Sequence, residues 1–80
     1  MKHAFMNERK AYLMGYLDAK QGRGLYYRGP KVKLFDPTGG GTWYLASFNL
    51  ETSIAFIREY LRGAKDFGAG KPASPTTQGD

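Results

Sequence analysis

A run of turn-forming residues near the middle of the chain constrains the fold most. Residues 36–41 read Asp-Pro-Thr-Gly-Gly-Gly, a composition typical of turns. The run separates two short stretches, residues 31–35 and 42–48, in which side chains alternate between two faces as they do in strands. We therefore expect a two-stranded antiparallel hairpin. Because a lone hairpin is barely stable in water, it should pack on other elements.

The first of these strands has one apolar face and one cationic face. Val32 and Leu34 point to one side, and Lys31 and Lys33 point to the other. This pattern predicts a strand that is half-buried, with its lysines in solvent. The second strand, residues 42–48, is rich in aromatic side chains.

The stretch before the hairpin predicts a helix over residues 8–21. Asn7 can accept from the free amides of the first turn and so is a good N-cap, and Gly22 is a natural C-cap. Gly15, in the middle of this helix, indicates close approach of another element, such as a second helix. The apolar face is formed by Tyr12, Leu13, Tyr16 and Leu17.

The stretch after the hairpin predicts a second helix, over residues 50–66, with Asn49 as its N-cap. Its apolar positions at helical spacing are Leu50, Ile54, Ile57 and Leu61, flanked by Phe56 and Tyr60. The predicted fold is therefore α+β, with two helices packed on the hairpin in the order helix–strand–strand–helix. We expect one domain over residues 1–67. Residues 68–80 are small, polar and rich in proline, which predicts a disordered tail.

The two predicted helices resemble each other in sequence. Ala11–Ala19 can be aligned with Ala55–Gly63, with identical alanine, tyrosine and leucine positions. Whether this reflects a duplication or only two amphipathic helices of similar composition is left open. In either case, the likeness predicts that the helices pack on each other.

The composition excludes several classes of function. The chain has 80 residues, no cysteine, and one histidine, His3, so we expect neither disulfides nor a His/Cys metal site. A serine nucleophile would need a base that the single histidine is poorly placed to provide. Asp18 and Asp36 are explained by turn and helix-end positions. We therefore expect a protein that is not an enzyme and has no cofactor. With no signal-peptide pattern and no apolar run of membrane-span length, we expect it in the cytoplasm.

The positive charge is concentrated in one segment. The chain has a net charge of +5. Between Asp18 and Asp36 lie five cations and no anion, and the adjacent Tyr26 and Tyr27 lie among them. Clustered cations with aromatic residues are typical of a surface that binds an acidic partner or nucleic acid. The predicted partner-binding residues are Arg23, Tyr26, Tyr27, Arg28, Lys31 and Lys33 of this segment, with Lys2 and Phe5 of the N-terminal segment.

Three interpretations of this segment remain open. It could dock on a protein of a nucleic-acid machine, with tyrosines as anchors. It could bind single-stranded nucleic acid directly, with lysines on phosphates and Tyr26 or Tyr27 stacked on a base. It could also be a solvated face whose tyrosines cover the core. The sequence does not decide between core and interface for the two tyrosines.

A local resemblance favours the ribosome as one partner. Gly15-Tyr16 followed by Gly22-Arg23, with Pro30 beyond, resembles the first half of the ribosome modulation factor family, whose pattern is Gly-Tyr-x-x-Gly-x-x-Gly-Arg. Ala19 stands where that family has glycine, and the family lacks a hairpin like the one expected here. The resemblance implies a protein that binds ribosomal RNA without catalysis.

In its overall character the chain is similar to the small basic host-takeover proteins of lytic phages. Some of these bind the host RNA polymerase and either inhibit initiation or promote antitermination. This likeness implies a monomeric transcription regulator that acts in the host cytoplasm. RNA polymerase is therefore the first expected partner and the ribosome the second, with direct contact to nucleic acid as a further alternative and no membrane partner.

Overall fold

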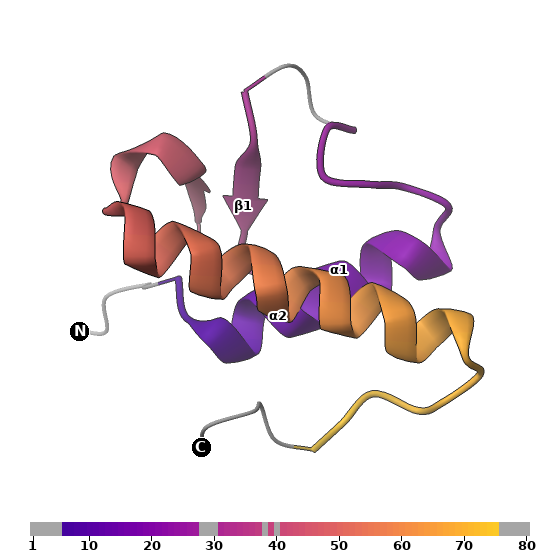
Figure 1. Ribbon diagram of the computed structural model, residues 1–80. Coiled ribbons are helices and arrows are strands. Elements are labelled where there is room, and N and C mark those ends of the chain that lie inside the picture. The colour runs from indigo at the N-terminus through magenta and orange to yellow at the C-terminus, as the bar shows by residue number, and fades with distance from the viewer. Residues whose placement is uncertain (1–5, 28–30, 38, 40, 76–80) are drawn as a thin grey trace.

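Two crossing helices and a short hairpin make up the fold (Figure 1). The computed structural model describes residues 6–27, 31–37, 39 and 41–75. The elements are α1 (Glu8–Lys20), β1 (Lys33–Phe35), β2 (Thr42–Tyr44), the 3-10 turn η1 (Leu45–Ser47) and α2 (Leu50–Gly68). The predicted order of helix, strand, strand and helix is confirmed, and the two strands pair antiparallel.

Both helices begin and end as their local sequences dictate. The side chain of Asn7 accepts from the amide of Lys10 at 2.9 Å, and that of Asn49 accepts from the amide of Thr52 at 2.8 Å, so both predicted N-caps are confirmed. The residue after each C-cap is a glycine with φ of 75°, Gly22 in α1 and Gly70 in α2. With this left-handed backbone, the amides of the glycine and of the residue after it donate to carbonyls of the last helical turn.

Glycines bring the two helices into backbone contact where they cross. A side chain at Gly15 would overlap the backbone carbonyl of Tyr60, and one at Gly63 would overlap the carbonyl of Tyr12. Both helices run from left to right in Figure 1 and cross in that view. The close approach predicted for Gly15 is confirmed.

Two tyrosine–aspartate hydrogen bonds flank this crossing. The hydroxyl of Tyr60 donates to Asp18 at 2.8 Å, and the hydroxyl of Tyr12 donates to Asp66 at 2.6 Å. Each contact that a residue of α1 makes with α2 is therefore matched by the same kind of contact from α2 to α1, as in an approximate two-fold symmetry. The equivalent pairs, each 48 residues apart, are Tyr12 and Tyr60, Gly15 and Gly63, Asp18 and Asp66, and Gly22 and Gly70. The alignment of Ala11–Ala19 with Ala55–Gly63 is wrong by four residues, because it follows the apolar pattern instead of the glycines.

The hairpin is shorter than predicted. Leu34 pairs with Trp43 at its centre and is buried, whereas Lys33 and Phe35 on either side of it are partly buried. Lys31, which precedes β1, is exposed, but Lys33 is not fully in solvent as predicted. The amide of Leu45 still donates to the carbonyl of Val32 at 3.0 Å, but β2 ends there. Residues 45–47 turn into η1, which leads the chain directly to the start of α2.

The core lies between the helix crossing and the inner face of the hairpin. Phe48 packs edge-on against Phe56, with 5.0 Å between ring centroids. Trp43 is only partly buried, against the edge of the core. The buried apolar residues are Met6, Ala11, Tyr12, Met14, Leu34, Phe56 and Tyr60. In the described part of the chain, no helix is long and apolar enough to cross a membrane.

Residues 71–75, here named the C-terminal strap, turn back after α2 and run below the two helices in the view of Figure 1. The hydroxyl of Tyr16 donates to the carbonyl of Lys71 at 2.6 Å, and the amide of Ser74 donates to the hydroxyl of Tyr12 at 2.7 Å. Arg9 donates to the carbonyl of Ser74. This part of the chain therefore differs from the disordered tail expected from residue 68. The rest of that tail, residues 76–80, lies outside the described residues.

Candidate binding surfaces

The apolar stripe that marked the second helix faces solvent. Leu50 is 76% exposed, Ile54 50% and Leu61 53%. The buried face of α2 consists of Phe56, Glu59, Tyr60 and Gly63. Gly63 lies on this inward face and, having no side chain, allows the backbone of α1 to approach closely. Three of the four aliphatic positions of the stripe are therefore at least half exposed, and the fourth, Ile57, is partly buried.

Leu50 and Ile54 of this stripe, together with Ile57, form one wall of a groove of about 690 Å³. Its other wall comes from the end of the hairpin and from η1, which lies beside the first turns of α2 (Figure 1). The hydroxyl of Ser53 donates to the carbonyl of Leu45 at 3.1 Å and so fixes η1 to the helix. The groove is lined by Lys31, Val32, Tyr44, Leu45, Ala46, Ser47, Leu50, Ser53, Ile54 and Ile57.

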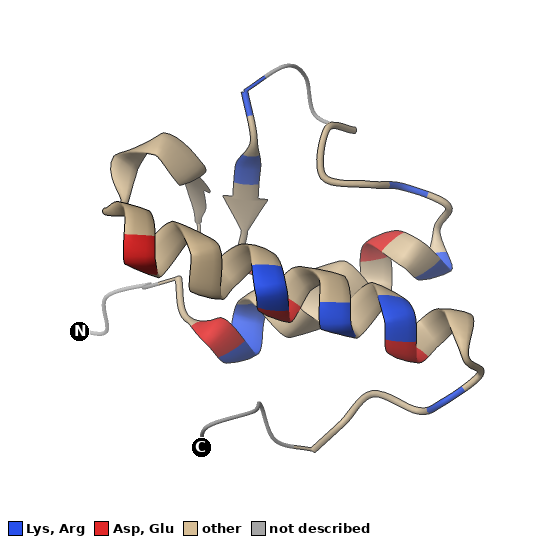
Figure 2. Cartoon of the chain, viewed as in Figure 1, with Lys and Arg blue, Asp and Glu red and all other residues tan. Residues whose placement is uncertain are grey.

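Three cations lie in or beside this apolar groove. Lys31 lies in its wall, and the ammonium of Lys33 lies 5.7 Å from the ring centroid of Tyr44. Arg58 is exposed and lies one helical turn from both Ile54 and Leu61. Figure 2 shows basic positions on the segment that leads into β1 and along the second half of α2. Glu51 is the acidic residue at this end of α2.

A second exposed surface, here named the tyrosine loop, comprises residues 23–27. Leu25 packs against the core, whereas Tyr26 is 68% and Tyr27 55% exposed. The guanidinium of Arg23 lies over the ring of Tyr27, 4.3 Å from its centroid. Both tyrosines therefore lie at the surface and not in the core, and their role in binding a partner stays a prediction.

The predicted site residues fall into two groups. Arg23, Tyr26 and Tyr27 lie together in the tyrosine loop, and Lys31 and Lys33 lie beside the groove. Three further predicted residues, Lys2, Phe5 and Arg28, lie outside the described residues.

Sequence reasoning missed the groove itself. A usable signal was present in the second helix, which carries two apolar faces. One comprises Leu50, Ile54, Ile57 and Leu61, and the other comprises Phe56 and Tyr60. A helix on the surface of a small domain buries only one such face, so the other had to be exposed or covered by a partner.

The buried carboxylates all have structural partners. Asp36 pairs with Lys10 at 2.7 Å, and Glu59 pairs with Arg62 at 2.8 Å. Asp18 accepts from the Tyr60 hydroxyl, so a helix-end role does not account for it. In the part of the chain that the structure describes, no cluster of three His, Cys, Asp or Glu side chains could hold a metal ion.

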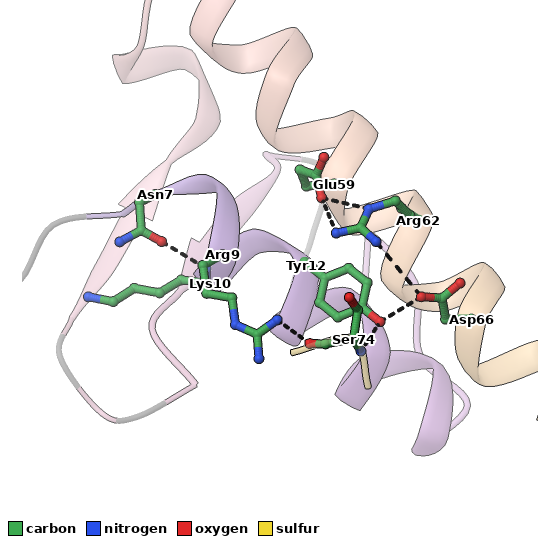
Figure 3. Close-up of polar contacts among 8 residues, drawn as sticks. All are labelled: Asn7, Arg9, Lys10, Tyr12, Glu59, Arg62, Asp66 and Ser74. Atoms are coloured by element: carbon green, nitrogen blue, oxygen red, sulfur yellow. Dashed lines mark hydrogen bonds and ion pairs between the residues drawn. The ribbon is translucent and has the colours of Figure 1, made fainter. Parts of the chain in front are cut away.

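Tyr12 is the centre of a buried polar network (Figure 3). Its ring lies under the guanidinium of Arg62, 4.2 Å from the centroid, and its hydroxyl bonds both Asp66 and Ser74. Burial raises the pKa of the Tyr12 phenol above its ordinary value, and the hydrogen bond to Asp66 raises it further. This network ties α1, α2 and the C-terminal strap together.

Comparisons of the chain with protein-family models, with curated proteins and with solved structures found no match. The resemblances to ribosome modulation factors and to phage regulators therefore stay predictions.

Proposed function

We propose that the protein is a non-enzymatic regulator that docks through its apolar groove on the RNA polymerase of a bacterial host. The single observation that carries this proposal is the exposure of Leu50, Ile54 and Leu61 along one face of α2. Contiguous exposed apolar side chains with a polar rim mark protein interaction sites. A nucleic-acid backbone offers no apolar group to fill such a groove, which favours a protein partner.

The cations around the groove indicate the charge of that partner. Lys31, Lys33 and Arg58 lie beside the apolar stripe, and the whole chain carries a net charge of +5. An acidic rim on the partner would complement these groups and accelerate the encounter. The partner segment is therefore apolar at its centre and acidic at its edges. The choice of RNA polymerase is supported by the likeness of the chain to phage regulators of that enzyme.

The test is direct binding to purified bacterial RNA polymerase, measured by biolayer interferometry at moderately high salt. The wild-type chain is expected to bind, and Ile54→Glu is expected to weaken binding at least about tenfold. The loss of one buried aliphatic side chain is worth about 1.5–3 kcal/mol, and the new carboxylate also faces the acidic rim.

Glu51→Gln is the matched control, because it changes an exposed residue on the same helix that does not line the groove. It should bind at least as tightly as the wild type. Absence of binding to the polymerase would refute the proposal. Binding to purified ribosomes that Ile54→Glu abolishes would instead transfer the docking function to the ribosome.

A further inference from the structure

We infer that the tyrosine loop is a second binding site, which takes an unpaired nucleotide by stacking its base on Tyr26. The loop shares no residue with the groove. The inference therefore does not rest on the proposed docking function and can fail without it.

The tyrosine loop is held in place at both its start and its centre. The amide of Arg23 donates to the carbonyl of Asp18 at 2.7 Å, which fixes the chain where it leaves α1. Leu25 packs against the core, and the amide of Tyr27 closes a turn on the carbonyl of Gly24 at 3.0 Å. Because these contacts order the loop before any ligand arrives, little conformational entropy is lost when it binds.

The side chains of the loop have the chemistry of a nucleotide site. Tyr26 is 68% exposed and offers a ring for base stacking, to which every base can contribute its own π-face. The guanidinium of Arg23 stacks on the ring of Tyr27, with its Cζ 4.3 Å from the ring centroid. The N–H groups of this guanidinium can donate to a phosphate. Lys20, exposed at the end of α1 and three residues before Arg23 in the chain, adds a second positive charge.

The arrangement favours single strands over duplexes. Base stacking requires an unpaired base, whereas a duplex presents only its phosphates to such a loop. Among the described residues, Arg23 and Lys20 make a small phosphate footprint, so their electrostatic attraction alone would bind a strand weakly, and this binding would be lost as salt rises. Stacking of an unpaired base on Tyr26 would therefore supply the affinity that the charges alone do not.

The experiment measures fluorescence anisotropy of a labelled twelve-residue oligothymidylate at low salt, with the full chain and with a labelled duplex of equal length. We expect Tyr26→Ala to weaken binding of the single strand at least about fivefold, as the loss of one stacked base does. Arg23→Gln should weaken it and make it less dependent on salt. Tyr44→Ala is the matched control, since Tyr44 is also an exposed tyrosine beside a cation but lies at the groove.

The proposal is supported if the single strand binds more tightly than the duplex and only the loop variants weaken it. It is overturned if no single-strand binding is detected at low salt. Equal binding of single strand and duplex with no effect of Tyr26→Ala would also overturn it, because that result indicates general attraction between opposite charges. Circular dichroism of each variant verifies that it is folded.

Discussion

The hydroxyl of Tyr60 donates a 2.8 Å hydrogen bond to the buried carboxylate of Asp18 across the crossing of α1 and α2. The same bond recurs between Tyr12 and Asp66, on the other side of the contact. The crossing is thus held by paired polar bonds as well as by apolar packing. Three of the predictions below test these helix contacts, the fourth tests the C-terminal strap, and the fifth tests which face of α2 belongs to the core.

Replacing either crossing glycine should destabilise the protein strongly. In Gly15→Ala and Gly63→Ala the new methyl would overlap the backbone of the facing helix, which cannot move aside as a side chain could. We expect a loss of about 2–3 kcal/mol or more in the free energy of unfolding, measured with urea. Gly68→Ala, in open space at the end of α2, is the control and should be neutral or slightly stabilising. Equal effects at all three positions would contradict the close crossing.

Removing the Tyr60 hydroxyl should weaken the fold because a buried carboxylate loses a donor. Tyr60→Phe is expected to cost about 1–3 kcal/mol of unfolding free energy. Tyr44→Phe removes a hydroxyl from an exposed tyrosine and should stay within about 0.5 kcal/mol of the wild type. Chemical denaturation of both variants in parallel makes the comparison. If they lose the same amount, the Asp18 bond does not contribute.

The raised pKa of Tyr12 leads us to expect that the protein loses stability at alkaline pH. Its pKa is raised in the folded state, chiefly by burial, so the folded protein holds this proton more tightly than the unfolded chain does. The resulting stabilisation is fully present below the ordinary pKa of 10.0 and is lost as pH rises through the folded value. Urea unfolding between pH 8 and 11 should show a steeper fall for the wild type than for Tyr12→Phe. Parallel curves would contradict the assignment.

The C-terminal strap should contribute to stability through its backbone. Ser74→Pro removes the amide that donates to Tyr12, and we expect it to cost about 1 kcal/mol or more. Ser74→Ala retains that amide and serves as the control. Thermal melts of the two variants should therefore separate. If the proline variant melts with the alanine variant, the strap is not held as the structure shows.

The two faces of α2 should respond differently to substitution. Phe56→Ala, in the core, is expected to cost about 3–5 kcal/mol. Ile54 lies two residues earlier, on the opposite face of the helix, and is 50% exposed, so Ile54→Glu should cost far less. Hydrogen exchange or thermal melting of the pair gives the comparison. Comparable losses would place the stripe of the groove in the core after all.

The elements could be predicted from sequence because their signals are local. Asn7 and Asn49 define the helix starts through side-chain bonds three residues ahead, and the glycine-rich run at residues 36–41 requires a turn. These interactions depend on neighbours in the chain, which the sequence gives directly. The fold order followed from them.

The surfaces could not be predicted, because they depend on how the elements are oriented. The stripe at Leu50, Ile54 and Leu61 has the spacing of a core face, yet the core uses Phe56 and Tyr60. Periodicity reports that a face is apolar and cannot say whether this chain or another molecule covers it. The inward face of α2 is marked by Gly63, and its role in the helix crossing is recognised only when Gly15 is identified as the equivalent residue of α1.

The helix crossing and the groove are formed by different residues. The crossing depends on Tyr12, Gly15 and Asp18 and their counterparts 48 positions later, whereas the groove is built from the hairpin, η1 and the opposite face of α2. A lineage could therefore change what this small protein recognises while leaving its framework intact. For an engineer, the same separation makes the exposed groove positions, such as Tyr44, Leu50 and Ile54, residues to randomise, while the core residues of the hairpin and the repeated tyrosine, glycine and aspartate of the helices are kept.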